Sequence, residues 1–236
     1  HESEVIDYVE EDVIMIPDLS TIRKIPWNKE PTAQIICDLY YNSVSPSDIA
    51  PRQILKNMIK TLREDNMEAI VAPELEFYLC EQNLDPDLPL KTPVGKSGRR
   101  EMSSQAFGVD AVNEFDKITD DIYDYCEILG IGVDTLVHES GPAQIEINLN
   151  HGDPLQLADQ AFMFKRAVRQ VALKHGVHAT FMAKPYSGQP GSYMHIHQNL
   201  ISTKSKDNLF SDQEGNNTNL FLNYISFILS GIFIAP

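Results

Sequence analysis

A strand-like segment of this chain reads Ala72-Pro73-Glu74-Leu75-Glu76-Phe77-Tyr78 and carries two carboxylates two positions apart. Successive side chains of a β-strand point to opposite faces, so Glu74 and Glu76 are expected on one face. An exposed strand face often carries such a pair, and this is the simplest reading. The apolar and aromatic neighbours instead favour an inner strand, where carboxylates are costly unless a cation neutralises them.

Two imidazoles show the same spacing in Tyr193-Met194-His195-Ile196-His197-Gln198. His195 and His197 could be ordinary hydrogen-bonded histidines of a sheet. The preceding loop, Gln189-Pro190-Gly191-Ser192, is made of small residues, which let the backbone approach a ligand closely. The spacing and the loop together indicate a binding site.

Between these segments lies His138-Glu139-Ser140-Gly141-Pro142-Ala143-Gln144-Ile145-Glu146-Ile147-Asn148. The turn signal Gly141-Pro142 could fold Glu139 and Glu146 to the same end of a hairpin. Four carboxylates and one imidazole, with few cysteines, favour Mg²⁺ or Mn²⁺ over structural zinc. Sites of this type commonly handle phosphates, and no Walker, GxSxG or GxGxxG motif is present. The residues alone therefore predict a divalent-metal site with a phosphate-bearing substrate.

Composition limits the partners and the compartment. The 236 residues allow one or two domains, and a net charge of −15 argues against nucleic acid or an anionic membrane as the main partner. Cys37, Cys80 and Cys126 are scattered, which is typical of reduced thiols in a cytoplasmic protein. The chain begins at His1, so we expect it to be part of a longer protein. The most apolar stretch, 221–236, is short for a membrane span and is expected to be a buried helix.

The pattern predicts an α+β fold in which much antiparallel sheet is flanked by helices. Strands are expected at 13–16, ending in a turn at Pro17-Asp18, and at 33–39, 68–80, 133–139, 144–150, 178–183 and 193–201. Helices are expected from 51 to 66, capped by Ser47 or Asp48, and at 110–129 and 153–175. The segment 83–104 is rich in Pro, Gly and basic residues, so it is expected to be an irregular, mobile loop.

The quoted motifs resemble the glutamine synthetase family. Further matching segments run along the chain: Asp12-Val13-Ile14-Met15-Ile16-Pro17-Asp18-Leu19-Ser20-Thr21 and Thr180-Phe181-Met182-Ala183-Lys184-Pro185. The resemblance implies the C-terminal half of a small β-grasp domain at 1–45, followed at 46–236 by a catalytic domain of antiparallel sheet flanked by helices. It also implies a cytoplasmic, ring-shaped homo-oligomer, a dodecamer, with no nucleic-acid or membrane partner.

The same resemblance implies an ATP-dependent ligase. ATP phosphorylates the side-chain carboxylate of glutamate, and ammonia or an amine then displaces phosphate from γ-glutamyl phosphate. The implied ligands of two or three Mg²⁺ or Mn²⁺ ions are Glu76, Glu139 and Glu146 at one site, and Glu74 and His195 at another. Glu76, Gly191 and His195 would adjoin the glutamate substrate, and Asp134, His197 and Asn199 would lie on the ATP side.

Three departures limit this assignment. Family members often have Asn-Gly-Ser-Gly-Met-His where this chain has Pro190-Gly191-Ser192-Tyr193-Met194-His195, so an asparagine is lost and Tyr193 adds bulk. Asn199 replaces a common serine. The chain stops at Pro236, before the family's arginine-bearing segment and a further glutamate ligand, and the first half of the β-grasp domain is missing. No catalytic residue is therefore assigned, and residues 1–236 alone are expected to be inactive.

The acceptor and the class of function stay open from the sequence. Pro190 and the run at 121–126 are more similar to the γ-glutamylpolyamine (putrescine) synthetase branch than to the glutamine synthetases. A catalytically silent structural relative and a metal-dependent phosphohydrolase are the alternatives of other classes. The retained carboxylates argue against the silent relative.

Overall fold

The computed structural model describes residues 12–85 and 87–234. In this part of the chain the strands are β1 (Ile14–Lys24), β2 (Ala33–Tyr40), β3 (Met67–Glu81), β4 (Val133–His138), β5 (Gln144–Leu149), β6 (Val177–Thr180) and β7 (Met194–Ser202). The helices are α1 (Pro51–Glu64), α2 (Val109–Asn113), α3 (Asp116–Leu129), α4 (Pro154–Lys174) and α5 (Asn219–Ile234). The mixture of helices and antiparallel sheets agrees with the predicted α+β class.

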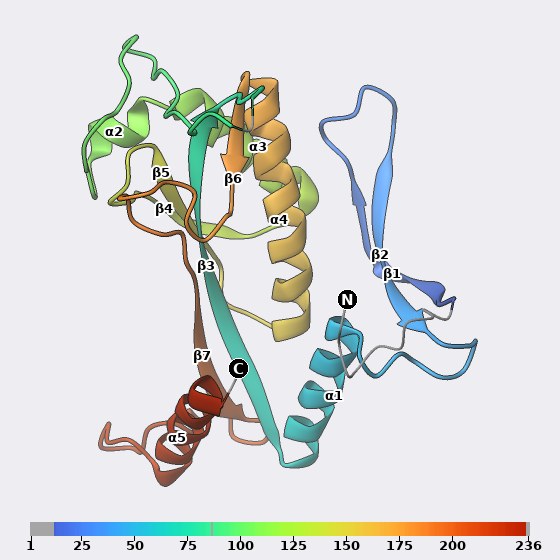
Figure 1. Ribbon diagram of the computed structural model, residues 1–236. Coiled ribbons are helices and arrows are strands. Elements are labelled where there is room, and N and C mark those ends of the chain that lie inside the picture. Colours follow the sequence, from blue (N-terminus) through green and yellow to red (C-terminus); the bar gives the residue numbers. More distant parts are fainter. Residues whose placement is uncertain (1–11, 86, 235–236) are drawn as a thin grey trace.

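The long strand β3 is the centre of a five-stranded antiparallel sheet (Figure 1). β5 pairs with Glu74–Tyr78 of β3, and β4 pairs with β5. β7 pairs with Met67–Leu75 and β6 with Tyr78–Glu81, so both lie along the other edge of β3. This topology brings residues from three distant segments of the chain against β3.

One face of this sheet forms the hydrophobic core. Leu75, Phe77 and Leu79 alternate along β3 and are at most 1% exposed. They pack with the apolar sides of α3 and α4, including Ile122 and Phe164. Because strand side chains alternate, the intervening residues of β3 point to the opposite face. Burial of the apolar set thereby fixes which face carries the carboxylates.

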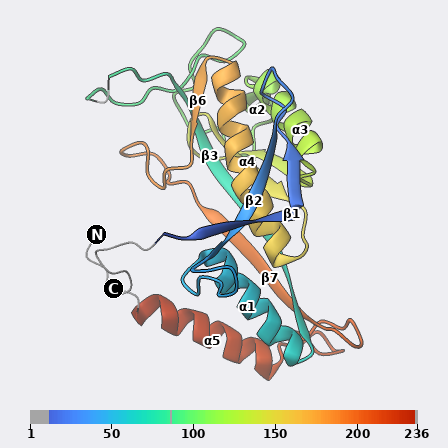
Figure 2. The same ribbon diagram turned by 90° about the vertical axis from the view of Figure 1, so that its right-hand side faces the viewer.

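Helix α4 lies between the sheet and the β1–β2 hairpin, as both ribbon views show (Figures 1 and 2). It begins where Asp153 accepts hydrogen bonds from the backbone N–H groups of Leu155 and Gln156, both at 3.0 Å. Pro154 occupies the first turn, where its missing N–H costs nothing. The helix ends at Lys174 with His175 as its C-cap, and Gly176 follows with a positive φ of 73°.

The hairpin differs from the prediction at Pro17-Asp18. This dipeptide does not end the strand, because β1 continues to Lys24 and Pro17 pairs with Cys37. The register shifts between Asp18 and Arg23 instead. β1 is an edge strand in the described sheet, and a proline is tolerated there. The described hairpin has two strands, so its place in a β-grasp domain stays a prediction.

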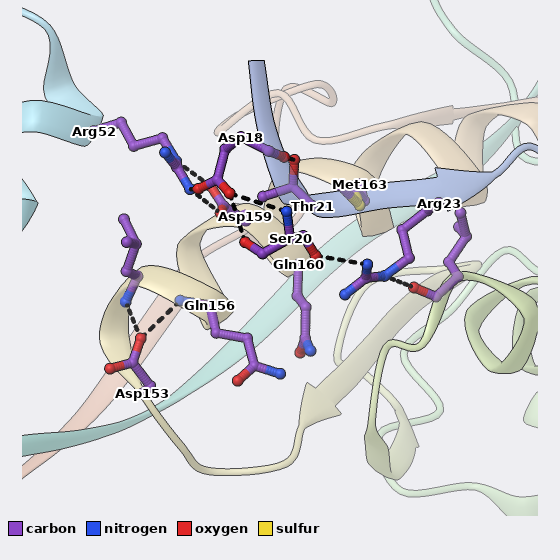
Figure 3. A pocket seen from close by; sticks show the side chains of 12 residues that line it. Asp18, Ser20, Thr21, Arg23, Arg52, Asp153, Gln156, Asp159, Gln160 and Met163 are labelled. Atoms are coloured by element: carbon purple, nitrogen blue, oxygen red, sulfur yellow. Dashed lines mark hydrogen bonds and ion pairs between the residues drawn. The ribbon is translucent and has the colours of Figure 1, made fainter. Parts of the chain in front are cut away.

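Arg52 of α1 pairs with three aspartates and so holds the hairpin to α1 and α4. Two of them, Asp18 and Asp38, lie on the hairpin and the third, Asp159, lies on α4; we call all three the hairpin aspartates. Arg52 lies 2.7 Å from Asp18 and 2.9 Å from Asp159, and Lys56 also pairs with Asp38. Figure 3 shows the guanidinium of Arg52 directed at Asp18 and Asp159 at the edge of a pocket of about 380 Å³. This cluster is a complete ion-pair network between the hairpin and the helices.

The predicted start of α1 at residue 51 is confirmed, but its predicted cap and the uninterrupted helix at 110–129 are wrong. Helix α1 starts after Ala50, which makes no side-chain cap, whereas Ser47 is buried and its N–H donates to the carbonyl of Leu39. The helix expected at 110–129 is interrupted between α2 and α3. There Phe115 leaves the helical conformation with φ −120° and is buried in the core. Tertiary burial of one aromatic ring overrides the local helical pattern.

The predictions for the long loop, the strand at 178–183 and the C-terminal segment were confirmed only in part. Residues 83–85 and 87–104 are irregular, as predicted, apart from an isolated bridge between Val94 and Arg100, whereas residue 86 lies outside the described residues. The mobility of this loop stays a prediction. The strand expected at 178–183 ends at Thr180. The apolar C-terminal segment forms α5, but Leu222 and Ile225 are 52% and 38% exposed, so the prediction of a buried helix is wrong for this part. No described helix is long and apolar enough to cross a membrane.

Candidate metal-binding site

The sheet register gathers the predicted ligands on the face opposite the core. Glu76 lies directly across from Glu146 of β5, and Glu74 lies across from His195 of β7. Side chains of directly opposed residues in antiparallel strands point to the same face. The expected convergence of these four residues is therefore observed, and their role as metal ligands stays a prediction.

Three of these side chains have the spacing of ligands around one ion. Ligand atoms of Glu74, Glu146 and His195 all lie within 4.8 Å of one another. Oxygen and nitrogen ligands bind such ions at about 2.0–2.6 Å, so two ligands of one ion are separated by up to about 4–5 Å. The carboxylate of Glu74 also lies 3.3 Å from Nδ1 of His195 and 2.8 Å from Nε2 of His197. The donor set fits Mg²⁺ or Mn²⁺ with one imidazole.

Glu76 is held in place by two neutral donors. It is 5% exposed, and its Oε2 accepts hydrogen bonds from the Gln144 side-chain amide at 2.9 Å and the Tyr193 backbone N–H at 3.2 Å. The same amide of Gln144 donates to the carbonyl of Gly191 at 2.9 Å, and its oxygen accepts from the N–H of Gly141. Gln144 thus connects the Glu76 carboxylate, the small-residue loop and the turn after Glu139.

Glu139 lies at the turn between β4 and β5, as the sequence indicated. Its N–H donates to the carbonyl of Gln144 at 2.8 Å, and its carboxylate accepts from the N–H of Ser140 at 3.2 Å. It is not among the three residues with single-ion spacing. Its charge nevertheless raises the pKa of both Glu76 and Glu146. Glu139 therefore belongs electrostatically to the same cluster, which we call the sheet carboxylates: Glu74, Glu76, Glu139 and Glu146.

Burial and mutual repulsion both act on this cluster. Burial is the largest cause that raises the pKa of Glu76, and Glu139 and Glu74 raise it further. Burial likewise raises the pKa of Glu146, with added repulsion from Glu74 and Glu139. Within residues 12–85 and 87–234, no lysine or arginine forms an ion pair with the sheet carboxylates; only His195 and His197 do. A cation from outside the described chain would relieve both costs.

The side chains of His195, His197 and Asn199 form a row along β7. They lie opposite Glu74, Ala72 and Ile70 of β3 and share the face of the carboxylates. Oδ1 of Asn199 is buried and has no hydrogen-bond partner among the described residues. This row extends the site along the strand.

The structure does not bring Asp134 into the cluster. Asp134 is exposed on β4, and its charge acts on Tyr123 of α3. No hydrogen bond or ion pair joins it to the sheet carboxylates in the described part of the chain. Its assignment to the ATP side stays a prediction.

The small-residue loop packs closely against β3 and β5. A Cβ on Gly191 would lie 2.8 Å from the carbonyl oxygen of Ala183, and one on Gly141 would lie 1.9 Å from the hydroxyl of Tyr78. That hydroxyl donates to the carbonyl of Pro190 at 2.8 Å. The ring of Tyr193 stacks on His195, with centroids 5.6 Å apart and planes 12° apart. Both glycines are therefore required by close approach.

Sequence reasoning missed three polar residues behind the site. Gln144 was visible only as part of the polar face of its strand. Glu101, from the long irregular loop, and the fully buried His138 form a hydrogen-bonded pair that no local spacing indicates. Their hydrogen bonds support the Glu76 carboxylate and the turn at Glu139.

Comparisons with known proteins find relatives that match most of this chain. A family model described as glutamine synthetase, catalytic domain, matches residues 48–232. Gamma-glutamylputrescine synthetase PuuA of Escherichia coli (strain K12) is 36% identical over 213 residues, which cover 89% of this chain and 45% of that protein. Glutamine synthetase of Methanocaldococcus jannaschii is 35% identical over 228 residues, with coverage of 94% and 48%. A glutamate–isopropylamine ligase of Pseudomonas sp is 34% identical over 194 residues, with coverage of 80% and 40%.

Solved structures show the same relationship. Apo GmaS without ligand matches with a TM-score of 0.75 and 27% identity over 88% of this chain and 47% of that one. A novel glutamine synthase homolog matches with a TM-score of 0.73 and 18% identity over 87% and 45%, which is evidence for the fold alone. The chain spans about half the length of the curated relatives it matches. With 185 consecutive positions inside the family model, this chain belongs to the glutamine synthetase family.

Proposed function

We propose that the protein containing this chain is an ATP-dependent ligase that forms an amide on the γ-carboxylate of glutamate through γ-glutamyl phosphate. One observation carries the proposal: sheet register collects Glu74, Glu76, Glu146 and His195 on one face, with no lysine or arginine paired to them in the described residues. Family membership adds the reaction class. The first choice of acceptor is ammonia, as in a glutamate–ammonia ligase.

The chain's own residues would divide the work as follows. Glu76, Glu139 and Glu146 would hold one Mg²⁺ or Mn²⁺ ion, and Glu74 and His195 a second. Glu146, whose ligand atom lies within 4.8 Å of those of Glu74 and His195, would then lie between the two ions. Bound there, such ions would neutralise the charge on the phosphoryl group during transfer. Gln144 and the N–H of Tyr193 both donate to Oε2 of Glu76, so the proposed ligand is positioned before any ion arrives.

The proposal places glutamate and ATP on two sides of the sheet carboxylates, glutamate at the small-residue loop and ATP along β7. The small-residue loop at Gly191 would offer its backbone to glutamate, because a side chain there would clash with Ala183. The row of His197 and Asn199 along β7 would face ATP, where the unpartnered Oδ1 of Asn199 can accept a hydrogen bond. Asp134 is proposed for the same side on family grounds only.

A γ-glutamylpolyamine synthetase is the second candidate. Pro190 and Tyr193 replace residues common in the glutamine synthetases of the family. The E. coli relative named for putrescine and the M. jannaschii relative named for glutamine match at 36% and 35% identity, so similarity does not separate them. A ring-shaped homo-oligomer, with residues 1–45 in a β-grasp domain and 46–236 in the catalytic domain, completes the proposal. Reduced cysteines favour the cytoplasm, since Cys37, Cys80 and Cys126 are free.

The decisive experiment is a phosphate-release and amide-formation assay of the whole protein. It would contain ATP, glutamate, Mg²⁺ or Mn²⁺, and in turn ammonia, putrescine, longer polyamines or isopropylamine. We expect phosphate release that requires both glutamate and one acceptor, and that falls about a hundredfold or more in Glu146→Gln. The matched control is Glu127→Gln, an exposed glutamate on α3, which should leave turnover unchanged. Phosphate release without an acceptor would instead identify a phosphohydrolase, and no release under any condition would identify a silent relative.

A further inference from the structure

A buried carboxylate from the long irregular loop reaches the back of the site. The side chain of Glu101 is 6% exposed. Its Oε2 is hydrogen-bonded to Nε2 of His138 at 3.0 Å and accepts a hydrogen bond from the backbone N–H of Ala143 at 2.8 Å. His138 and Ala143 stand on either side of the turn that begins at Glu139. One carboxylate oxygen therefore ties together the two ends of this turn.

His138 connects Glu101 to the backbone of Glu139 through its two ring nitrogens. Its ring is completely buried, and its Nδ1 lies 2.8 Å from the backbone carbonyl oxygen of Glu139. Both ring nitrogens are therefore engaged, Nε2 by the Glu101 carboxyl group and Nδ1 by the Glu139 carbonyl. A ring held at both nitrogens cannot rotate without breaking a buried hydrogen bond, which is costly. The backbone at Glu139 is thereby fixed relative to Glu101.

The second hydrogen bond of the Glu101 carboxylate holds the backbone of Ala143. This residue has a φ of +55°, a left-handed conformation that residues with a side chain rarely adopt. Its carbonyl accepts from the N–H of Leu79 on β3, and its N–H is held by Glu101. From the opposite side, the side-chain oxygen of Gln144 accepts from the N–H of Gly141. The turn is thus clamped between a buried carboxylate and a buried amide.

We infer that Glu101 is a positioning residue of the metal site, which acts through His138 and Ala143 to hold the turn so that Glu139 faces Glu76 and Glu146. The inference rests on the proposed function, because the role of Glu139 as a ligand belongs to it.

Anchoring the loop does not by itself require Glu101. The loop is also attached one residue earlier, where Arg100 pairs with Glu81 and donates to the carbonyl of Thr92. Both contacts of the Glu101 carboxylate go instead to the turn.

The test measures Mn²⁺ binding to the whole protein without substrates, by calorimetry and by the electron paramagnetic resonance spectrum of the bound ion. We expect Glu101→Gln to weaken Mn²⁺ affinity about tenfold and Glu101→Ala about a hundredfold, the range seen when partners of metal ligands are removed. The spectrum should change as well, because the ligand geometry around the ion changes. Glu81→Gln is the control, since it loosens the same loop without touching the turn; its affinity and spectrum should equal those of the wild type.

Far-UV circular dichroism at the binding temperature establishes that each variant is folded. If Glu101→Ala does not fold, Glu101→Gln decides, because it keeps the shape of the side chain. Wild-type affinity and spectrum in folded Glu101→Gln would overturn the inference, even if the variant melted at a lower temperature. Glu139→Gln separates this result from the proposed function. If Glu139→Gln binds Mn²⁺ normally, the proposed ligand set fails; if it binds weakly while the Glu101 variants bind normally, only the inference fails.

Discussion

The hairpin aspartates and the sheet carboxylates differ in what neutralises them. Arg52 pairs with all three hairpin aspartates, and Lys56 adds a second cation at Asp38. A hydrogen bond from Ser20 and another from Arg52 lower the pKa of Asp18 from 3.8 to about 2. At the sheet carboxylates the described chain supplies only imidazoles, and the pKa values of Glu76 and Glu146 are raised.

This difference separates a structural cluster from a candidate functional one. Burial alone would raise the pKa of Asp38 too, but hydrogen bonds from Lys56 and Arg52 lower it. Both clusters are partly buried and acidic, so neither burial nor residue type tells them apart. The direction of the pKa shift does, because it reports whether the protein has supplied its own counter-charge. The sheet carboxylates are the cluster for which the described residues supply no lysine or arginine, in agreement with the proposed metal site.

Removing the internal cation should have the largest effect on stability. We expect Arg52→Met to lower the free energy of unfolding by about 3 kcal/mol, since three aspartates lose their buried partner. Urea denaturation at fixed protein concentration measures this. Arg63→Met is the matched control on the same helix, because Arg63 is 57% exposed and lies 3.9 Å from Asp153. Its loss should be about 0.5 kcal/mol or less. Equal losses in the two variants would show that the Arg52 network contributes no more to the free energy of unfolding than an exposed ion pair does.

Adding the external cation should stabilise the protein through the other cluster. Mn²⁺ at about 100 times its Kd is expected to raise the free energy of unfolding by about 2.7 kcal/mol, as for any ligand that binds only the folded state. Glu146→Gln should lose this increment, while its metal-free form is at least as stable as the wild type because one repulsive charge is gone. Asp159→Asn should lower the baseline and keep the full increment. A metal increment retained in Glu146→Gln would place the ion elsewhere.

The sequence was sufficient for the sheet carboxylates because a strand has a fixed period. Glu74 and Glu76, like His195 and His197, had to share a face once their segments were strands. The register that sets Glu76 against Glu146 joins residues far apart in the chain. The turn signal at Gly141-Pro142 concerned only Glu139 and Glu146, and the convergence of Glu76 with Glu146 was expected from the same-face spacing together with the family resemblance.

The contacts that escaped prediction depend on tertiary structure. Pro17-Asp18 has the composition of a turn, yet Asp18 is used to bind Arg52, which lies 34 residues later. Glu101 reaches His138 across 37 residues from a loop with no periodic pattern. Phe115 breaks a helical pattern because it is drawn into the core. Local propensity carries no information about such partners.

The smallest expected effect is a difference in how the two clusters respond to pH. The folded-state pKa of Asp18 is depressed, so its contribution to stability is present above the unfolded value of 3.8 and is lost as the pH falls toward about 2. The folded-state pKa values of Glu76 and Glu146 are raised, so the opposite sign applies. Their contribution is present below the unfolded value of 4.5 and is lost as the pH rises through the folded values.

Metal-free protein should therefore lose stability at both ends of a series of thermal melts between pH 2 and pH 7, for different reasons. Glu76→Gln should reduce only the limb above pH 4.5, and Asp18→Asn only the limb below pH 4. Neither should remove its limb, because the pKa of Glu146 is also raised and that of Asp38 also lowered. Mn²⁺ should also remove the upper limb, because a bound divalent ion favours the ionised carboxylates that repel one another without it. The amplitudes are expected to be small, since partly exposed charges are screened by solvent and salt. An upper limb that persists in Glu76→Gln and in saturating Mn²⁺ would mean that repulsion among the sheet carboxylates does not govern it, and the contrast between the two clusters in what neutralises them would then fail.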